Sequence, residues 1–332
     1  MATQFGVLLP HFGHAATKER VIDRAPLLEA WGFDSVWVRD HLMFQPHGFE
    51  QQSTKFFEPF TTLTAIAAIT KRLIVGTGTL IPFRHPLVAS QLLGGVSLVA
   101  GPGRLIVGLG AGTPKKPFDA TGTSFEARFQ GVKETAEIFR LTWSQPKASY
   151  KGEVYAFDGI TIDPHPPADT PIWYGGSTPA SVRRALEYAD GWFPGRCPLR
   201  TFKKYGNRIR KGAARLGKQM SAAIIPVISV DKDRATAVSK VNVGGLLEEG
   251  RERKYWDGPF NTVDDLEGIL IAGSPDDCIK EVQKFIEYGT DHLVFDFRLR
   301  PDDYDTQVAW VARDILPAVK VLAAKMRANV GS

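Results

Sequence analysis

The chain has 332 residues, of which 43% are hydrophobic and 23% are charged, as is ordinary for a globular protein with a sizeable core. Its net charge of +5 is dispersed and neither end carries a basic tail, which favours an anionic small molecule over nucleic acid as a partner. Cys197 and Cys278 have no near cysteine neighbour, so neither a disulfide framework nor a metal site is suggested. Without a leader or long apolar stretch, we expect a cytoplasmic protein with no membrane partner.

The first part of the chain alternates short apolar runs with helical patterns. Strands are predicted over residues 5–10, 35–38, 73–79 and 105–109, and helices over residues 19–31, 59–70 and 84–99. Gly32 ends the first helix, and Pro86 is tolerated because it lies in the first turn of its helix. Repeated strand-helix units at this spacing predict a parallel sheet.

The second part continues the alternation with more interruption. Strands are predicted over residues 171–174, 191–193, 222–230 and 292–296, and helices over residues 125–143, 179–189, 199–216, 275–288 and 304–326. Ser274 is suited to cap the helix that follows it. Residues 149–167, rich in Gly, Pro and aromatics, are expected to be an inserted extended segment. Residues 241–263 fit neither period and are expected to be an inserted lid. About eight strand-helix units predict one domain over residues 1–332, an α/β fold of the (β/α)8 TIM-barrel type.

A doubly wound sheet is the rival fold, because a glycine-rich run at residues 108–112 follows a strand. The position three residues after Gly110 is Thr113, so the dinucleotide-binding spacing is absent. The motifs of phosphoryl transfer, zinc hydrolysis and serine hydrolysis are also absent from the sequence. The barrel is therefore preferred.

One strand, residues 35–38, is followed by Arg39 and then by Asp40 and His41. In a parallel barrel the carboxyl ends of the strands form the floor of the active site. His41 can donate or accept a proton near neutral pH, and Asp40 can support its charged form. The alternative is a loop histidine that follows a helix-capping aspartate, and the residues alone leave both open.

Two glycine-rich segments suggest a ligand site at the same end of the sheet. Gly78 and Thr79 end the third strand, where small residues allow a bulge or a flat ligand against the backbone. Gly175, Gly176 and Ser177 lie between a strand and a helix, so free backbone N–H groups meet the positive helix end and suit a phosphate. Ordinary turns and a capped loop are the alternatives.

Two further residues are candidates for the wall of the same cavity. His11 follows the first strand and Glu58 precedes Pro59 at the start of a helix. Glu58 also suits the simpler role of complementing the helix dipole.

Taken together, these segments resemble the luciferase-like flavin and deazaflavin oxidoreductases over almost the whole chain. The marks are residues 32–41 with their Asp-His ending, residues 76–82 with 84–86, residues 103–112, and residues 171–176 with 189–192. The Asp-His pair is similar to the branch that uses coenzyme F420, whereas FMN-dependent relatives share the barrel.

The resemblance implies a role for each matching residue. His41 would be the proton donor or electrostatic stabiliser beside the cofactor ring, with Asp40 as its partner and as a ring contact. Gly78 and Thr79 would form a non-proline cis bulge behind the ring. The remaining implied cofactor contacts are Gly110, Ala111, Gly112 and Thr113 along the cofactor, and Gly175, Gly176 and Ser177 at its phosphate.

The chain departs from the sugar-phosphate dehydrogenases of this family. Those members have a tryptophan shortly after the Asp-His pair and a glutamate after the strand-four glycines, where this chain has residues 42–44 and 113–115 without either. This argues against glucose 6-phosphate as the substrate. Phe44 and Phe57 instead suggest an apolar or aromatic wall, which completes a substrate pocket predicted from His11, Phe44, Phe57 and Glu58.

The resemblance therefore implies an F420-dependent oxidoreductase that transfers a hydride between deazaflavin C5 and a small organic substrate, and it implies a homodimer. One alternative is an FMN-dependent monooxygenase that uses FMNH2 and O2 and needs a separate flavin reductase. A second alternative is a non-catalytic flavin-binding barrel.

Overall fold

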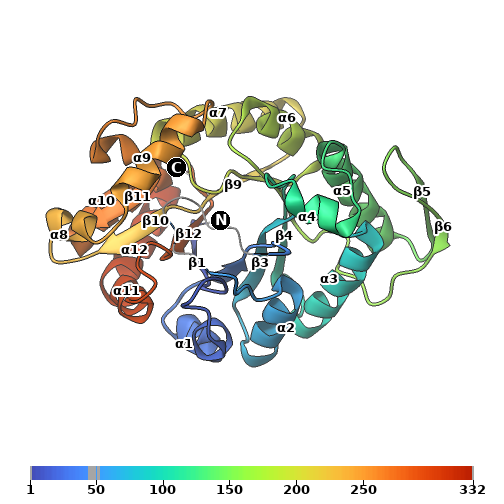
Figure 1. Cartoon of the computed structure of the whole chain (residues 1–332), viewed down its shortest axis with the longest axis horizontal. Helices are drawn as coiled ribbons and strands as arrows, with labels where there is room; N and C mark the ends of the chain where they lie inside the picture. The colour runs from blue at the N-terminus through green and yellow to red at the C-terminus, as the bar shows by residue number, and fades with distance from the viewer. Residues whose placement is uncertain (1, 44–49, 51–52, 331–332) are drawn as a thin grey trace.

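A closed barrel of parallel strands forms the centre of the molecule. The computed structural model describes residues 2–43, 50 and 53–330. Within them the barrel strands are, in spatial order, β1 (Gln4–Leu8), β2 (Ser35–Val38), β3 (Ile74–Leu80), β4 (Leu105–Leu109), β7 (Ile172–Gly175), β8 (Gly191–Phe193), β9 (Ser221–Ile224) and β12 (His292–Asp296). Pairing of β12 with β1 closes the ring, so the predicted (β/α)8 barrel is confirmed (Figure 1).

Helices surround this barrel (Figure 1). They are a π-helical turn (Glu19–Asp23) with α1 (Ala25–Ala30), α2 (Pro59–Ile69), α3 (Pro86–Ala100), α5 (Arg128–Ser144), α6 (Pro179–Tyr188), α7 (Leu199–Arg215), α10 (Pro275–Glu287), α11 (Tyr304–Trp310), a second π-helical turn (Val311–Ile315) and α12 (Leu316–Val330). Ser274 caps α10 as predicted, because its hydroxyl accepts from the Asp277 N–H while the Asp277 carboxylate accepts from the Ser274 N–H. In the described chain no helix is both long and apolar enough to span a membrane.

The barrel interior is filled by large side chains that the strands point inward. Trp37 of β2 stacks on Trp173 of β7 with ring centroids 5.4 Å apart, and Phe193 of β8 packs against both. A Cβ atom at Gly76 would lie 2.5 Å from the Trp37 ring, so only glycine fits there. Because helices cover the outer face as well, every residue of β2, β4, β8 and β12 is buried and no polar alternation appears.

The strand predicted over residues 222–230 is wrong as a single element. It is divided into β9 and β10 (Val227–Val230) around Pro226, which has no N–H for a ladder hydrogen bond. β9 belongs to the closed barrel, whereas β10 pairs with β11 (Leu270–Gly273) and meets β12 only where Val227 pairs with Asp296.

Two segments lie outside the strand-helix alternation. β5 (Ala148–Lys151) and β6 (Ala156–Ile160) form an antiparallel hairpin that projects beside α5 (Figure 1). The carboxylate of Glu134 on α5 accepts the N–H groups of residues 153–155 and so fastens the hairpin turn. Between β10 and β11 lie α8 (Arg234–Ser239), α9 (Val243–Glu252) and a 3-10 turn (Val263–Leu266). The single-domain division and both insertions stay predictions.

Three α-helices of the described residues were missed by the sequence patterns: α9, α8 and the short α4 (Lys116–Thr121). Adjacent glycines, Gly244 and Gly245, weaken the helical pattern of α9. α4 is only six residues long, too short to show a period.

Candidate cofactor cleft and active site

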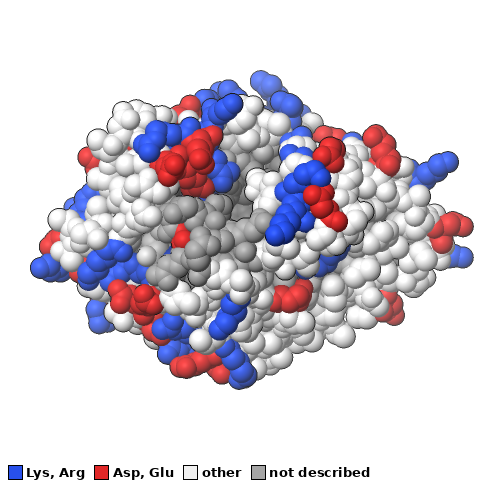
Figure 2. Space-filling view, viewed as in Figure 1, with Lys and Arg blue, Asp and Glu red and all other residues white. Residues whose placement is uncertain are grey.

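A cleft of about 560 Å³ opens where the carboxyl ends of several barrel strands meet. This lies within the roughly 300–1,000 Å³ typical of a small-molecule pocket, and Figure 2 shows the surface hollowed near its centre. The predicted cofactor residues that line the cleft are His41, Gly78, Thr79, Gly110, Ala111, Gly112, Thr113, Gly175, Gly176 and Ser177. Of the residues assigned to the cofactor, only Asp40 lies elsewhere.

The floor of the cleft is built around Thr79. The Gly78–Thr79 peptide bond is cis, as the resemblance implies, and the β3–β4 register shifts between Thr77 and Leu80. A Cβ atom at Gly110 would lie 2.2 Å from Thr79 Oγ1, and one at Gly175 would lie 2.8 Å from Thr79 Cγ2. The glycines on the two neighbouring strands therefore leave the space that the Thr79 side chain occupies.

The loop from β7 to α6 presents polar groups to the cleft. Gly176 has a φ of +135° and a Cβ atom there would lie 2.4 Å from Ser181 Oγ, so glycine is required. Thr178 caps α6 by accepting the Ser181 N–H, and Trp256 Nε1 donates to Ser177 Oγ at 2.8 Å. With its oxygen accepting from Trp256, the Ser177 hydroxyl can donate its hydrogen to an anion at the positive end of α6.

His41 is a neutral imidazole in this setting. Its ring lies edge-on to the Phe56 ring at 5.6 Å. Burial, followed by the positive charges of Arg39 and Arg298, lowers the pKa of His41 to about 3 against the opposing charge of Glu50. Near neutral pH the ring can therefore donate one hydrogen bond and accept another.

The expected partnership of Asp40 with His41 is corrected by the structure. Asp40 Oδ2 accepts from Arg84 Nη1 at 2.5 Å and from the Ile81 N–H at 3.1 Å. The side chain faces a smaller cavity, not the cleft, and this cavity lies between the ends of β3 and β4 and the helices α2, α3 and α5. Burial raises the pKa of Asp40 and the Arg84 charge opposes that effect. Asp40 thus holds Arg84 and the end of β3, while burial, assisted by the charges of Arg39 and Arg298, keeps His41 neutral.

A buried network of charges lies behind His41. Glu50 Oε1 is 3.1 Å from Arg298 Nη1 and 3.5 Å from Arg39 Nη2, and Arg298 also pairs with Asp296. The guanidinium carbons of Arg39 and Arg298 lie 3.5 and 5.3 Å from the centroid of the Phe12 ring. Burial lowers the pKa of Arg39 to about 9, which leaves it charged at neutral pH.

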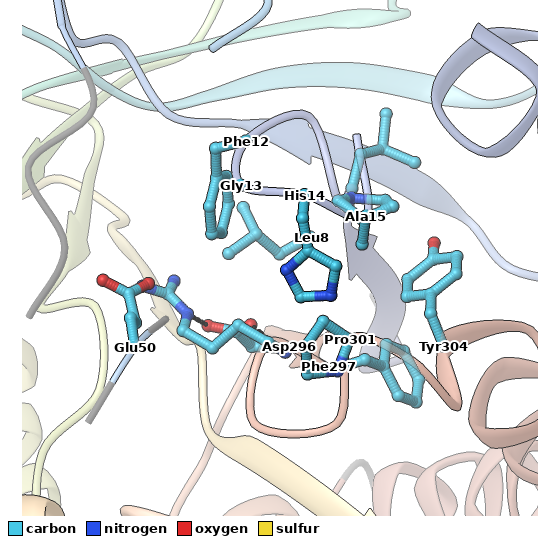
Figure 3. A pocket seen from close by; sticks show the side chains of 13 residues that line it. Leu8, Phe12, Gly13, His14, Ala15, Glu50, Asp296, Phe297, Pro301 and Tyr304 are labelled. Atoms are coloured by element: carbon cyan, nitrogen blue, oxygen red, sulfur yellow. Dashed lines mark hydrogen bonds and ion pairs between the residues drawn. The ribbon is translucent and has the colours of Figure 1, made fainter. Parts of the chain in front are cut away.

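The far side of this network borders a second, small cavity of about 40 Å³. Figure 3 shows Glu50 and Asp296 on one side of it and Tyr304 on the other. The Tyr304 hydroxyl is buried without a hydrogen-bond partner among the described residues. None of the residues that line this cavity lines the cleft, so it is a separate space.

Of the four predicted substrate-pocket residues, the three that the structure describes do not line the cleft. His11 is fully buried, its Nε2 accepts the Arg39 N–H at 2.8 Å and its Nδ1 lies 2.8 Å from Leu9 O, so it joins β1 to β2 as a neutral Nδ1–H tautomer. Glu58 caps α2 by accepting the Thr61 N–H at 2.8 Å. Phe57 is absent from the cleft wall, and Phe44 lies outside the described residues.

Several residues of the cleft were missed by the sequence analysis. They are Arg128, Phe129, Arg184 and Phe193, with Arg253 and Tyr255 from the segment after α9. The sequence did contain one indication that Arg128 binds a ligand. It lies at the start of a predicted helix, where a cation is unfavourable because it opposes the helix dipole. The three lining arginines face no lining aspartate or glutamate within the described cleft.

A flat cofactor with an anionic tail requires a floor formed by backbone without side chains, a capped helix end, and positive charge at the opening of the cleft. The fold and site thus define a cofactor-binding (β/α)8 barrel, and the unpartnered Nε of Arg128 fits a group with acceptor oxygens. The chain belongs to the luciferase-like monooxygenase family, whose model matches residues 3–292.

Known proteins resemble the chain over nearly its full length. It is 27% identical to the F420-dependent glucose-6-phosphate dehydrogenase of Nakamurella multipartita, over 94% of this chain and 97% of that protein. An F420-dependent secondary alcohol dehydrogenase, solved with an F420-acetone adduct, is 24% identical with a TM-score of 0.79, covering 96% of this chain and 99% of the other. The oxygenating constituent of a diketocamphane monooxygenase of Pseudomonas putida, solved with FMN, is 17% identical with a TM-score of 0.74, covering 96% and 99%. These structures show that the fold is shared.

Proposed function

We propose that the protein is an F420-dependent oxidoreductase that transfers a hydride between deazaflavin C5 and a small organic substrate. One observation carries the proposal: the cofactor residues implied by the family resemblance, other than Asp40, line a single cleft. The F420-dependent relative from Nakamurella multipartita, matched over nearly the whole of both chains, supports the choice of cofactor.

Each part of the cleft has a task in this function. F420, when bound, supplies hydride chemistry at C5. The backbone at Gly78 and Thr79 supports the ring, and the Gly176–Ser177 loop with the α6 N-terminus holds the phosphate. His41 would hydrogen-bond the substrate oxygen: as a neutral imidazole it would take the hydroxyl proton of an alcohol while hydride leaves for C5, and in the reverse direction the imidazolium would return that proton to the carbonyl oxygen.

The substrate is proposed to be small and largely apolar. Phe193, Pro194 and Ile225 provide an apolar part of the cleft wall. The tryptophan and glutamate typical of the glucose-6-phosphate dehydrogenases are missing at residues 42–44 and 113–115. A secondary alcohol or its ketone is the class that we would test first.

Parallel titrations with F420 and FMN, followed by absorbance and fluorescence, test the cofactor. Anaerobic mixing of the F420-loaded protein with a panel of alcohols then tests hydride transfer, seen as loss of the oxidised deazaflavin absorbance. We expect F420 to bind and be reduced. Binding of FMN alone with oxygen consumption from FMNH2 would replace the proposal by a monooxygenase, and tight binding without turnover would replace it by a non-catalytic barrel.

We also propose a homodimer formed through α3 and a cytoplasmic location. α3 contains no charged residue, and Val88, Leu92 and Val99 lie exposed on one side of it, with Leu98 71% exposed nearby. Such a face is apolar enough to pack against its own copy. Both cysteines are free and buried, which suits a reducing compartment.

A further inference from the structure

The imidazole of His41 packs against the ring of Phe56. The two rings are nearly perpendicular, with centroids 5.6 Å apart and an angle of 88° between their planes. Within the described residues, neither nitrogen of His41 has a hydrogen-bond partner. Phe56 does not line the cleft, so its contact with His41 lies outside it. Both nitrogens of His41 are therefore available to a ligand, while the direction of the imidazole depends on packing.

Phe56 is itself packed against two rings of the loop that follows β1. Its centroid lies 5.1 Å from that of His11 at an interplanar angle of 78°, and 6.3 Å from that of Phe12 at 22°. His11 is fully buried and uses both of its nitrogens, one toward Leu9 O and one to accept the Arg39 N–H. Because aromatic pairs prefer defined geometries, these two rings restrict where the Phe56 ring can lie.

The backbone at Phe56 is also held in place. An antiparallel β-bridge pairs Phe56 with Phe12. Beside this bridge, the Phe57 N–H donates to His11 O at 2.8 Å. Directly afterwards, Glu58 caps α2. Phe56 therefore projects from a backbone that is fastened both to the loop after β1 and to the start of a helix.

We propose that Phe56 is a positioning residue that holds the His41 imidazole in the direction needed for proton transfer. The inference rests on the proposed function, in which His41 exchanges a proton with the substrate oxygen. An imidazole can turn about two side-chain bonds. Displacement of a reacting group by about 1 Å can cost about 100-fold in rate. Without a hydrogen bond to a described residue, the imidazole depends on packing for this precision.

The first test follows the motion of the His41 ring in the protein without cofactor. NMR relaxation of the ring carbons in histidine-labelled protein measures how strongly each ring is ordered, and the His41 signal is identified by its absence from His41→Gln. Phe56→Leu removes the aromatic ring and keeps an apolar side chain. We expect the order parameter of the His41 ring to fall in this variant, because the ring loses the contact that limits its rotation.

The second test measures turnover of the F420-loaded protein with an alcohol. We expect Phe56→Leu to lower kcat about tenfold, less than removal of the imidazole, because His41 is displaced and not lost. KM should stay within twofold, as should the dissociation constants for F420 and for FO, the deazaflavin that lacks the phosphate and tail. Phe57→Leu is the matched control, because Phe57 is the equally half-buried neighbour and does not line the cleft. It should leave ring order and kcat unchanged.

Two results with Phe56→Leu overturn the positioning role: unchanged order of the His41 ring, or unchanged kcat. An equal fall of kcat in Phe57→Leu overturns it as well, because the loss would then be general. If Phe56→Leu fails to fold, Phe56→Met takes its place, since methionine fills irregular apolar space. Ring order is measured without cofactor, so a wild type that binds FMN and not F420 overturns the proposed function and leaves the ring measurement to decide on Phe56.

Discussion

Asp40 and His41 are neighbours in the chain, yet their side chains serve different cavities. The Asp40 carboxylate pairs with Arg84 and faces a cavity between the ends of β3 and β4 and the helices α2, α3 and α5, whereas the His41 imidazole lines the cleft. Adjacent residues at the end of a strand point to opposite sides of the sheet, which explains the divergence. A position that stabilises the fold and the proposed catalytic position thus lie side by side in the sequence.

Exchanging each residue should separate these two roles. We expect Asp40→Asn to lower the free energy of unfolding by about 2 kcal/mol, because a buried ion pair loses one charge while Arg84 keeps partial contact with water. We expect His41→Gln to lower kcat at least about 100-fold, the usual contribution of a proton-transfer group, with little change in stability. Denaturant unfolding and steady-state kinetics with the best substrate measure both. Similar kcat losses for the two variants, at unchanged stability, would contradict the assignment.

The pH profile should reveal the neutral state of His41. Because its pKa is lowered to about 3, the imidazole stays uncharged from pH 5 to 8 and should give kcat/KM no acidic limb near 6.5. Arg298→Gln removes one of the positive charges that lower the pKa of His41, so this pKa should rise. The acidic limb of kcat/KM should then move to higher pH, toward the measured range. The measurement is kcat/KM against pH for both proteins. A wild-type limb near 6.5 that is absent from His41→Gln would show that the histidine titrates normally.

The barrel was predictable because its strands are short apolar runs bounded by turn residues, as at residues 35–38 and 292–296. The division of residues 222–230 had one sequence signal, Pro226 itself, which the strand prediction overlooked. A strand buried on both faces has no polar alternation that would also have marked the break. The neutral His41 was beyond the sequence, because Arg39 and Arg298 meet only when β12 pairs with β1 and closes the ring. Asp40 was misjudged because adjacency in sequence does not fix the direction of a side chain.

Acid should destabilise the fold through its buried neutral histidines. The pKa of His292 is lowered to about 3 by burial, and its Nε2 lies 2.6 Å from Ser35 Oγ. The unfolded chain binds a proton near pH 6.5 that the folded chain refuses until about pH 3, so stability falls as pH drops through this window. The slope for one such group is about 1.4 kcal/mol per pH unit. His292→Gln should reduce the slope between pH 6 and 5 by that amount in urea unfolding. An unchanged slope would mean that the folded protein already protonates His292.

The homodimer proposal predicts sensitivity to one charge on α3. Leu92→Asp places a carboxylate in the middle of the exposed apolar side of this helix, and burying it against a second copy would be strongly unfavourable. We expect light scattering after size-exclusion chromatography to show a dimer for the wild type and a monomer for the variant. Leu216→Asp, the same change at an exposed leucine at the end of α7, should remain dimeric. A monomeric wild type, or a dimeric Leu92→Asp protein, would contradict the assigned surface.

The packing of Gly110 against Thr79 predicts a direct effect on cofactor binding. In Gly110→Ala the new methyl group would lie 2.2 Å from Thr79 Oγ1, so the floor of the cleft must shift. We expect the dissociation constant for FO, which has only the ring and its ribityl chain, to rise at least about tenfold, roughly 1.4 kcal/mol. Thr79→Ala removes the colliding atoms, so the double variant should bind FO better than Gly110→Ala alone, a positive coupling in the cycle. Gly244→Ala, whose methyl would have only an ordinary 3.6 Å contact, is the control. Additive losses in the cycle would show that Thr79 and Gly110 act on the cofactor independently.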